Sequence, residues 1–350
     1  MTGMTEELDE LRTAVRAVLT RHEGAAAWQP LTEQIGAAAL AVPEQYGGLG
    51  CGAVETHVVV SELGRALSPV PYIGSAVLAT QALLASGDER ACAELLPGLA
   101  DGAAVGALAW AEGGSWDPEA ITTRAERAPD GAWLLTGAKE HVLAGPEVPD
   151  LLLVFARTDA GLCLFRLDDV RDGFVPLPTM DRTRPQARVA LDRAPATLVG
   201  AEGDGARVLA RVRDVACAAL AAEQAGAAER ALEITVQYAK DRVQFGRPIG
   251  SFQAVKHRLA DLHAEVVAAR SLALAAAYAD CAPELAAAAK AACSEAYEKV
   301  AGEMIQLHGG IGITWEHAAH DFFKRAHSGR HLLGAPAVHR ERLARLLGFP

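Results

Sequence analysis

Arg242 opens the segment of this chain with the most definite chemical content. Gln244, Phe245 and Gly246 follow it closely, and Gln253 lies further along. A guanidinium at the end of a helix can meet a pyrophosphate through a charge-assisted, bidentate pair that lysine reproduces poorly. Phe245 offers an aromatic face, the two glutamines offer amide donors, and Gly246 lets the loop turn closely. This segment therefore predicts contact with a phosphorylated ligand.

A second segment is rich in glycine. Gly309, Gly310 and Gly312 follow Gln306, which lies one helical turn upstream. Glycines let backbone amides approach a ligand because no Cβ stands in the way. The alternative is that Gly309 and Gly310 simply end a helix. Together with the arginine segment, the pattern favours ligand contact.

The bulk properties exclude several classes of function. A formal net charge of −11 argues against nucleic acid as the main partner. The six cysteines form no CxxC pair and have no histidine at metal-ligand spacing, so we expect reduced thiols and no metal site. The sequence has no apolar run of the ~20 residues that a membrane span needs. The acidic N-terminus does not resemble a secretory signal, so we expect a cytoplasmic protein.

The spacing of apolar residues predicts the elements that position these segments. Helical periodicity covers 6–22, 54–67 and 75–84, whereas short apolar runs between turn signals predict strands at 133–136, 151–155, 162–167 and 188–191. Long alanine-rich helices are then predicted over 206–241, 252–281, 284–308, 316–327 and 336–347.

These elements indicate an α+β fold that is mainly α. We expect an N-terminal helical domain over 1–104, a small β-barrel or sandwich domain over 105–203, and a C-terminal four-helix bundle over 204–350.

Three motifs, taken in order along almost the whole chain, resemble those of the acyl-CoA dehydrogenase superfamily. Residues 238–261 (YAKDRVQFGRPIGSFQAVKHRLAD) resemble its Arg-x-x-Phe-Gly signature, 306–317 (QLHGGIGITWEH) its Gln-x-x-Gly-Gly-x-Gly motif, and 42–48 (VPEQYGG) its N-terminal turn. The resemblance implies FAD as cofactor and α,β-dehydrogenation of an acyl-CoA or acyl-carrier thioester. It also implies a homo- or hetero-tetramer, with an electron-transfer flavoprotein or a similar acceptor as partner. The residues implied to contact FAD are Arg242, Gln244, Phe245, Gln253, Gln306, Gly309 and Gly310. In the family, the arginine reaches the cofactor of a neighbouring subunit.

The catalytic base of the family is missing from its usual positions. Most members carry a glutamate where this chain has Leu333, and a minority carry it where this chain has Ala216. The remaining candidates are Asp214, which could instead be a helix N-terminal charge, and Glu223, which could instead be a buried partner of an arginine. Glu316 beside His317 could form an acid-base pair, but it lies in a region that in the family is better known for a structural than for a catalytic role.

The β domain also departs from the family pattern. Its flavin- and thioester-contacting run appears here as WAEGGSWD (110–117), with Trp110 in place of a threonine. The run whose tryptophan shields the flavin and whose threonine bonds it appears as residues 139–143, with His141 and Leu143 at those two positions. Elements that reach a neighbour's flavin are thus kept, and those that hold a subunit's own flavin are altered.

Three hypotheses follow. The chain is an FAD-dependent acyl-CoA dehydrogenase with its base displaced to Asp214 or Glu223, or a non-catalytic subunit that completes the FAD site of a partner. The third is a flavin monooxygenase or oxidase of the same fold, since fold and cofactor do not fix the reaction.

Overall fold

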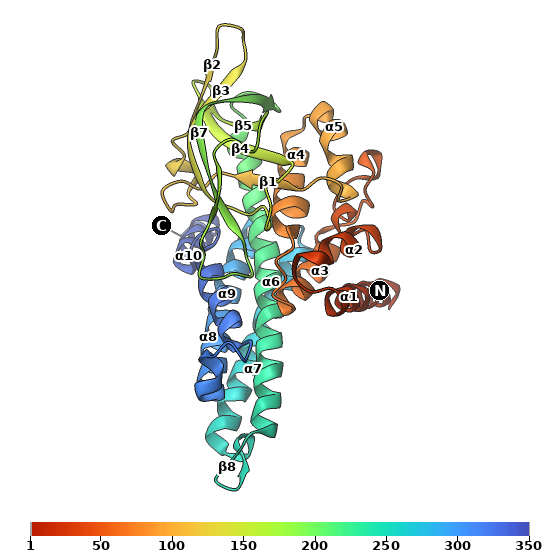
Figure 1. Cartoon of the computed structure of the whole chain (residues 1–350), viewed down its shortest axis with the longest axis vertical. Coiled ribbons are helices and arrows are strands. Elements are labelled where there is room, and N and C mark those ends of the chain that lie inside the picture. The colour runs from red at the N-terminus through yellow and green to blue at the C-terminus, as the bar shows by residue number, and fades with distance from the viewer. Residues whose placement is uncertain (1, 350) are drawn as a thin grey trace. The chain divides into compact units, whose positions relative to one another are not determined.

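The computed structural model describes residues 2–349 and gives side-chain surroundings from residue 6 onward. Within that range no helix is both long enough and apolar enough to cross a membrane. The chain forms two compact units (Figure 1). The first comprises the chain up to Thr56, Pro69–Thr179 and Arg184–Ala216, and the second comprises His57–Ser68, Met180–Thr183 and the chain from Cys217. The three-domain division expected from the sequence stays a prediction.

Short helices and a sheet build the first unit. The helices are α1 (Thr2–Arg21), α2 (Trp28–Glu33), α4 (Thr80–Ser86) and α5 (Glu89–Ala100), and a π-helical segment, Ile73–Ala79, leads into α4. Asp88 starts α5 because its Oδ1 accepts the Ala91 amide at 3.0 Å, which satisfies one of the free donors of the first turn. Helix α3 (Ala53–Arg65) is divided between the two units.

The sheet of the first unit closes on itself. Its strands are β1 (Gly106–Ala109), β2 (Arg124–Arg127), β3 (Trp133–Val142), β4 (Leu151–Thr158), β5 (Gly161–Leu167), β6 (Phe174–Leu177) and β7 (Gln186–Val199). The order is β1-β4-β2-β3-β7-β5, β6 pairs with β7, and a further β4–β5 pairing completes a small barrel. Alternate residues of β7, namely Ala187, Val189 and Leu191, are buried, as expected when one face of a strand lies against a core.

The second unit is a helical bundle. It contains α6 (Gly205–Asp241) from Cys217 onward, α7 (Gln253–Tyr278), α8 (Pro283–His308), α9 (Ala319–His331) and α10 (Pro336–Leu346). Side chains of α6, α7, α8 and α9 share one hydrophobic core that is rich in alanine. Asp280 and Cys281 have positive φ, so α7 ends before residue 281, where the sequence predicted its end.

Two glycines let α3 and α6 approach closely within this unit. A Cβ at Gly64 would lie 2.1 Å from the Glu223 carbonyl oxygen, and one at Gly226 would lie 2.1 Å from the Ser61 carbonyl oxygen. Any larger residue would force these helices apart, and Glu223 lies at this crossing.

Candidate functional site

A tight hairpin at the end of the α6–α7 pair carries the arginine motif (Figure 1). Strands β8 (Val243–Gln244) and β9 (Arg247–Pro248) pair directly after α6, and their turn places both Phe245 (φ 53°) and Gly246 (φ 76°) in the left-handed region. Such turns suit the right-handed twist of a hairpin. The Arg242 carbonyl accepts the Ile249 amide at 2.8 Å, which fixes the backbone of Arg242. Phe245 is 92% exposed.

Tyr238 joins this hairpin to the glycine motif. Its hydroxyl donates to the His308 carbonyl at 3.3 Å, and the two rings stack with centroids 4.2 Å apart. Tyr238 lies one helical turn before Arg242, and His308 directly precedes Gly309. The structure therefore brings the two predicted cofactor motifs to the same end of the bundle.

The two central glycines of the second motif have different roles. Gly309 follows α8 with a φ of 62°, so it caps the end of that helix, which is the alternative expected for it from the sequence. Gly310 is exposed, has no positive φ, and a Cβ built on it would meet no atom within 4 Å. The local fold does not require glycine at 310, which leaves close approach of a ligand or partner as a physical reason for it.

The polar side chains at this end of the bundle are exposed to solvent. Arg242, Gln253 and Gln306 are exposed, and across the described part of the chain none of the three makes a side-chain hydrogen bond or ion pair. Gln244 is also exposed, and among the described residues its side-chain amide donates to the neighbouring Val243 carbonyl alone, at 2.9 Å. A free guanidinium and an unobstructed glycine backbone at one end of the bundle are groups that can bind the pyrophosphate of a dinucleotide.

Glu223 lies elsewhere, in a buried network. It is 2% exposed and accepts hydrogen bonds from Arg325, including one from Nε at 3.0 Å. Arg325 also donates to the carbonyl oxygens of Thr183 at 2.7 Å and Ser68 at 3.1 Å. Although burial disfavours the charged form, the carboxylates of Glu223 and Asp181 raise the pKa of Arg325. Glu223 precedes Arg242 by nineteen residues of α6, or about 28 Å along the helix.

The other positions considered for the base are also enclosed. Asp214 is 5% exposed on the part of α6 that belongs to the first unit. Leu333 is 3% exposed and adopts a φ of 62°, and its carbonyl accepts from His339 Nε2 at 3.0 Å. The ammonium of buried Lys290 donates to the Arg330 and Gly334 carbonyls, each at 3.2 Å. The turn at Leu333 is thus held by internal bonds and offers no carboxylate.

A buried ion pair on the sheet was not foreseen from the sequence. Glu112 accepts from Lys139 Nζ at 2.5 Å and from the amides and hydroxyls of Thr122 and Thr123. Burial alone would raise the pKa of Glu112, but the hydrogen bonds to its charged form outweigh burial and lower the pKa to about 2. Burial lowers the pKa of Lys139 to about 8. The 27-residue separation gives no local signal of this pairing.

The altered residues of the sheet pack against one another. Trp110 is 2% exposed and Leu143 is 6% exposed. His141 stacks on Trp116 with ring centroids 5.9 Å apart. None of these side chains provides the hydroxyl that the family resemblance places at Trp110 and Leu143.

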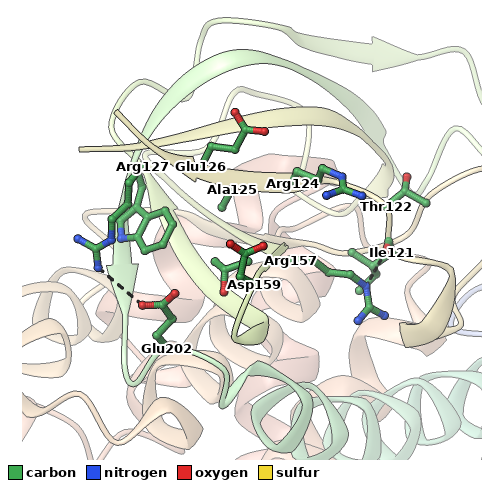
Figure 2. A pocket seen from close by; sticks show the side chains of 11 residues that line it. Ile121, Thr122, Arg124, Ala125, Glu126, Arg127, Arg157, Asp159 and Glu202 are labelled. Atoms are coloured by element: carbon green, nitrogen blue, oxygen red, sulfur yellow. Dashed lines mark hydrogen bonds and ion pairs between the residues drawn. The ribbon is translucent and has the colours of Figure 1, made fainter. Parts of the chain in front are cut away.

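A pocket of about 720 Å³ opens beside β2 in the first unit (Figure 2). Its walls carry charges of both signs, and Arg127 pairs with Glu202 at 3.7 Å across one side. Arg157 is already bound to the Ile121 carbonyl at 2.8 Å. None of the residues singled out in the sequence lines this pocket.

Comparisons with known proteins show which family the chain is similar to. Residues 203–348 match the model of the acyl-CoA dehydrogenase C-terminal domain, and residues 5–103 match that of the N-terminal domain. The chain is 41% identical to acyl-CoA dehydrogenase IpdE2 of Mycobacterium tuberculosis, over 97% of this chain and 96% of that protein.

Solved structures with acyl-CoA dehydrogenase names are also similar to this chain. The steroid ACAD Tcur3481-Tcur3483, as its G363A variant, is 32% identical with a TM-score of 0.87, covering 98% of both chains. The ChsE4-ChsE5 complex from Mycobacterium tuberculosis is 30% identical with a TM-score of 0.86, over 99% of this chain and 98% of that one. A glutaryl-coenzyme A dehydrogenase is 25% identical with a TM-score of 0.90, covering 98% and 96%.

Proposed function

This chain belongs to the acyl-CoA dehydrogenases, and we propose that within this family it completes the FAD site of a partner chain rather than carrying the catalytic base itself. FAD is the cofactor of this family, and when bound it supplies the acceptor for the hydride that leaves Cβ of the acyl thioester. The observation that carries the proposal is the free, exposed guanidinium of Arg242 at the same end of the bundle as the unobstructed Gly310, combined with leucine at position 333.

In this proposal the bundle end contributes binding and orientation. Arg242 pairs with the pyrophosphate, Gln253 and Gln306 donate or accept hydrogen bonds, and the backbone at Gly310 approaches the dinucleotide. Phe245, which is 92% exposed on its hairpin, packs against an aromatic or apolar part of the complex. Because these groups point away from their own core, they suit a cofactor held mainly by another subunit.

The arrangement of carboxylates supports a base on the partner. A thioester α-proton is weakly acidic, so its base must lie within hydrogen-bond reach and be free to accept a proton. Glu223 is already engaged by Arg325. Two of the similar structures have names that join two chains, which also favours a heteromeric assembly.

Purification of the chain alone and with a partner tests this proposal. The partner is a second acyl-CoA dehydrogenase chain from the same organism that carries the family glutamate. We expect colourless protein when the chain is produced alone. Co-production should give a yellow complex that reduces a dye with an acyl-CoA substrate.

Two outcomes would contradict the proposal. A chain that is yellow on its own and reduces the dye would place the base in this chain, at Asp214 or Glu223. Oxygen uptake with reduced flavin, without dehydrogenation, would indicate a monooxygenase or oxidase.

A further inference from the structure

Two aromatic side chains of the first unit stack where the resemblance places a flavin ring. Trp116 lies on His141 with ring centroids 5.9 Å apart and an interplanar angle of 25°. Trp110 meets the same indole edge-on at 4.9 Å and 75°. His141 holds the position of the flavin-shielding tryptophan, and Trp116 belongs to the run that faces the flavin. These two surfaces, which should both contact a flavin, instead contact each other.

Hydrogen bonds hold the turn that carries Trp116 against β3. The Gly114 amide donates to Glu140 Oε2 at 2.9 Å, and the Glu140 amide donates to the Ala111 carbonyl at 2.9 Å. The Trp110 indole N–H also donates to the Trp116 carbonyl at 3.4 Å. Trp116 is therefore fixed by its own turn as well as by ring stacking.

His141 is fixed from its other side. It adopts a φ of 55°, which is unfavourable for a residue with a Cβ and persists only where the surroundings hold it. Its Nδ1 lies 2.7 Å from Gln186 Oε1 of β7, so the ring nitrogen donates to the amide oxygen. The imidazole is thereby presented face-on to Trp116.

The chemistry of this face is also wrong for a flavin. An isoalloxazine ring needs hydrogen-bonding partners for its polar edge, and the positions expected to supply hydroxyls are Trp110 and Leu143. The indole of Trp116, in contrast, offers His141 a flat aromatic surface without any ligand. The residues on the sheet do not fit the cofactor, whereas those at the bundle end do.

We propose that Trp116, stacked on His141, is an aromatic plug that closes this chain's own flavin seat, so that the chain serves only a flavin held by its partner. This inference rests on the proposed function and extends it by naming the residue that prevents a second flavin from binding.

Lumiflavin, a flavin ring without the ribityl chain, tests the plug on the isolated chain. Trp116→Gly should leave a cavity of indole size between His141 and Trp110. We expect this variant to bind lumiflavin about tenfold more tightly than the unaltered chain, measured by quenching of lumiflavin fluorescence. Trp116→Phe keeps a ring in place and should not gain binding, and Trp28→Gly controls for loss of a tryptophan elsewhere in the unit. A folded Trp116→Gly chain without that gain would overturn the plug.

A second measurement needs no substitution at the plug. In the unaltered complex with its partner, fluorine-labelled tryptophan reports on Trp116 while FAD is added to flavin-free protein. The Trp116 resonance should stay unchanged as the complex turns yellow, whereas a large ring-current shift would contradict the inference. If Trp116→Gly gains nothing while the complex still binds flavin through Arg242, the plug fails and the proposed function stands.

Discussion

At the end of the bundle, the exposed side chains of Arg242, Gln253 and Gln306 make no hydrogen bond or ion pair with any described residue. On the sheet, Glu112 is surrounded by the ammonium of Lys139 and by donors from two threonines, and Trp116 is stacked on His141. Polar groups that satisfy one another stabilise a fold, whereas polar groups kept free in water are available to a ligand. Substitutions should therefore lower stability in the second region and flavin binding in the first.

The largest effect is expected for Glu112→Ala. The substitution leaves Lys139 buried with its charge and without its carboxylate, so the free energy of unfolding should fall by about 3–5 kcal/mol. Urea denaturation measures the change. Glu126→Ala, on an exposed position of the adjacent strand β2, is the matched control and should change stability by no more than about 0.5 kcal/mol. Equal effects of the two substitutions would contradict the importance of the buried pair.

The same pair makes stability depend on pH. The pKa of Glu112 is lowered from 4.5 to about 2 in the folded chain, so its contribution is complete above pH 4.5 and is lost as the pH falls through 2. The loss should be about 3 kcal/mol. The pKa of Lys139 is lowered from 10.5 to about 8, so the unfolded chain binds the proton more readily between these values. The free energy of unfolding should therefore rise as the pH increases from 8 toward 10.5. Glu112→Gln should flatten the acidic limb in urea titrations at successive pH values, and an unchanged limb would exclude Glu112 as its source.

Glu223→Gln separates the two interpretations of that carboxylate. If Glu223 serves Arg325, the substitution should lower the free energy of unfolding by about 1–3 kcal/mol while the complex keeps its turnover. Thermal melts and dye reduction by the co-purified complex give both values. Abolished turnover with an unchanged melting temperature would identify Glu223 as the base.

The smallest expected effect concerns Gly310→Ala. Since a Cβ there meets nothing within 4 Å, stability should change by no more than about 0.5 kcal/mol. If the backbone approaches the dinucleotide, the added methyl group should weaken flavin binding to the complex by about tenfold. Gly302→Ala on α8, which is equally unobstructed, should leave flavin binding unaltered. Identical flavin affinities for both variants would remove Gly310 from the proposed contact.

The helices were the most predictable part of the fold. Long apolar periodicities predicted the bundle, and α6 and α8 end within one residue of their expected bounds. Strands β1, β2 and β6 were missed because four residues such as RAER in β2 carry no alternating pattern. The α+β class and the fold of the family are nevertheless confirmed.

The site was predictable only where a motif is local. The arginine and glycine segments could be recognised from consecutive residues, and the φ of 76° at Gly246 agrees with the close turn expected there. The stack of Trp116 on His141 could not be predicted, since it joins a turn to a strand through tertiary packing. At Leu333 the sequence shows only that the residue cannot act as a base. The hydrogen bonds that hold its turn come from distant residues and could not be predicted.

The flavin content of the co-purified complex tests the central claim most directly. Arg242→Ala is compared with Lys240→Ala, which removes a charge from the same helix end two residues earlier. We predict that the Arg242→Ala complex assembles but loses most of its flavin, while the Lys240→Ala complex stays yellow. An assembled Arg242→Ala complex with an unaltered flavin-to-protein ratio would contradict the assignment of this bundle end to the partner's FAD.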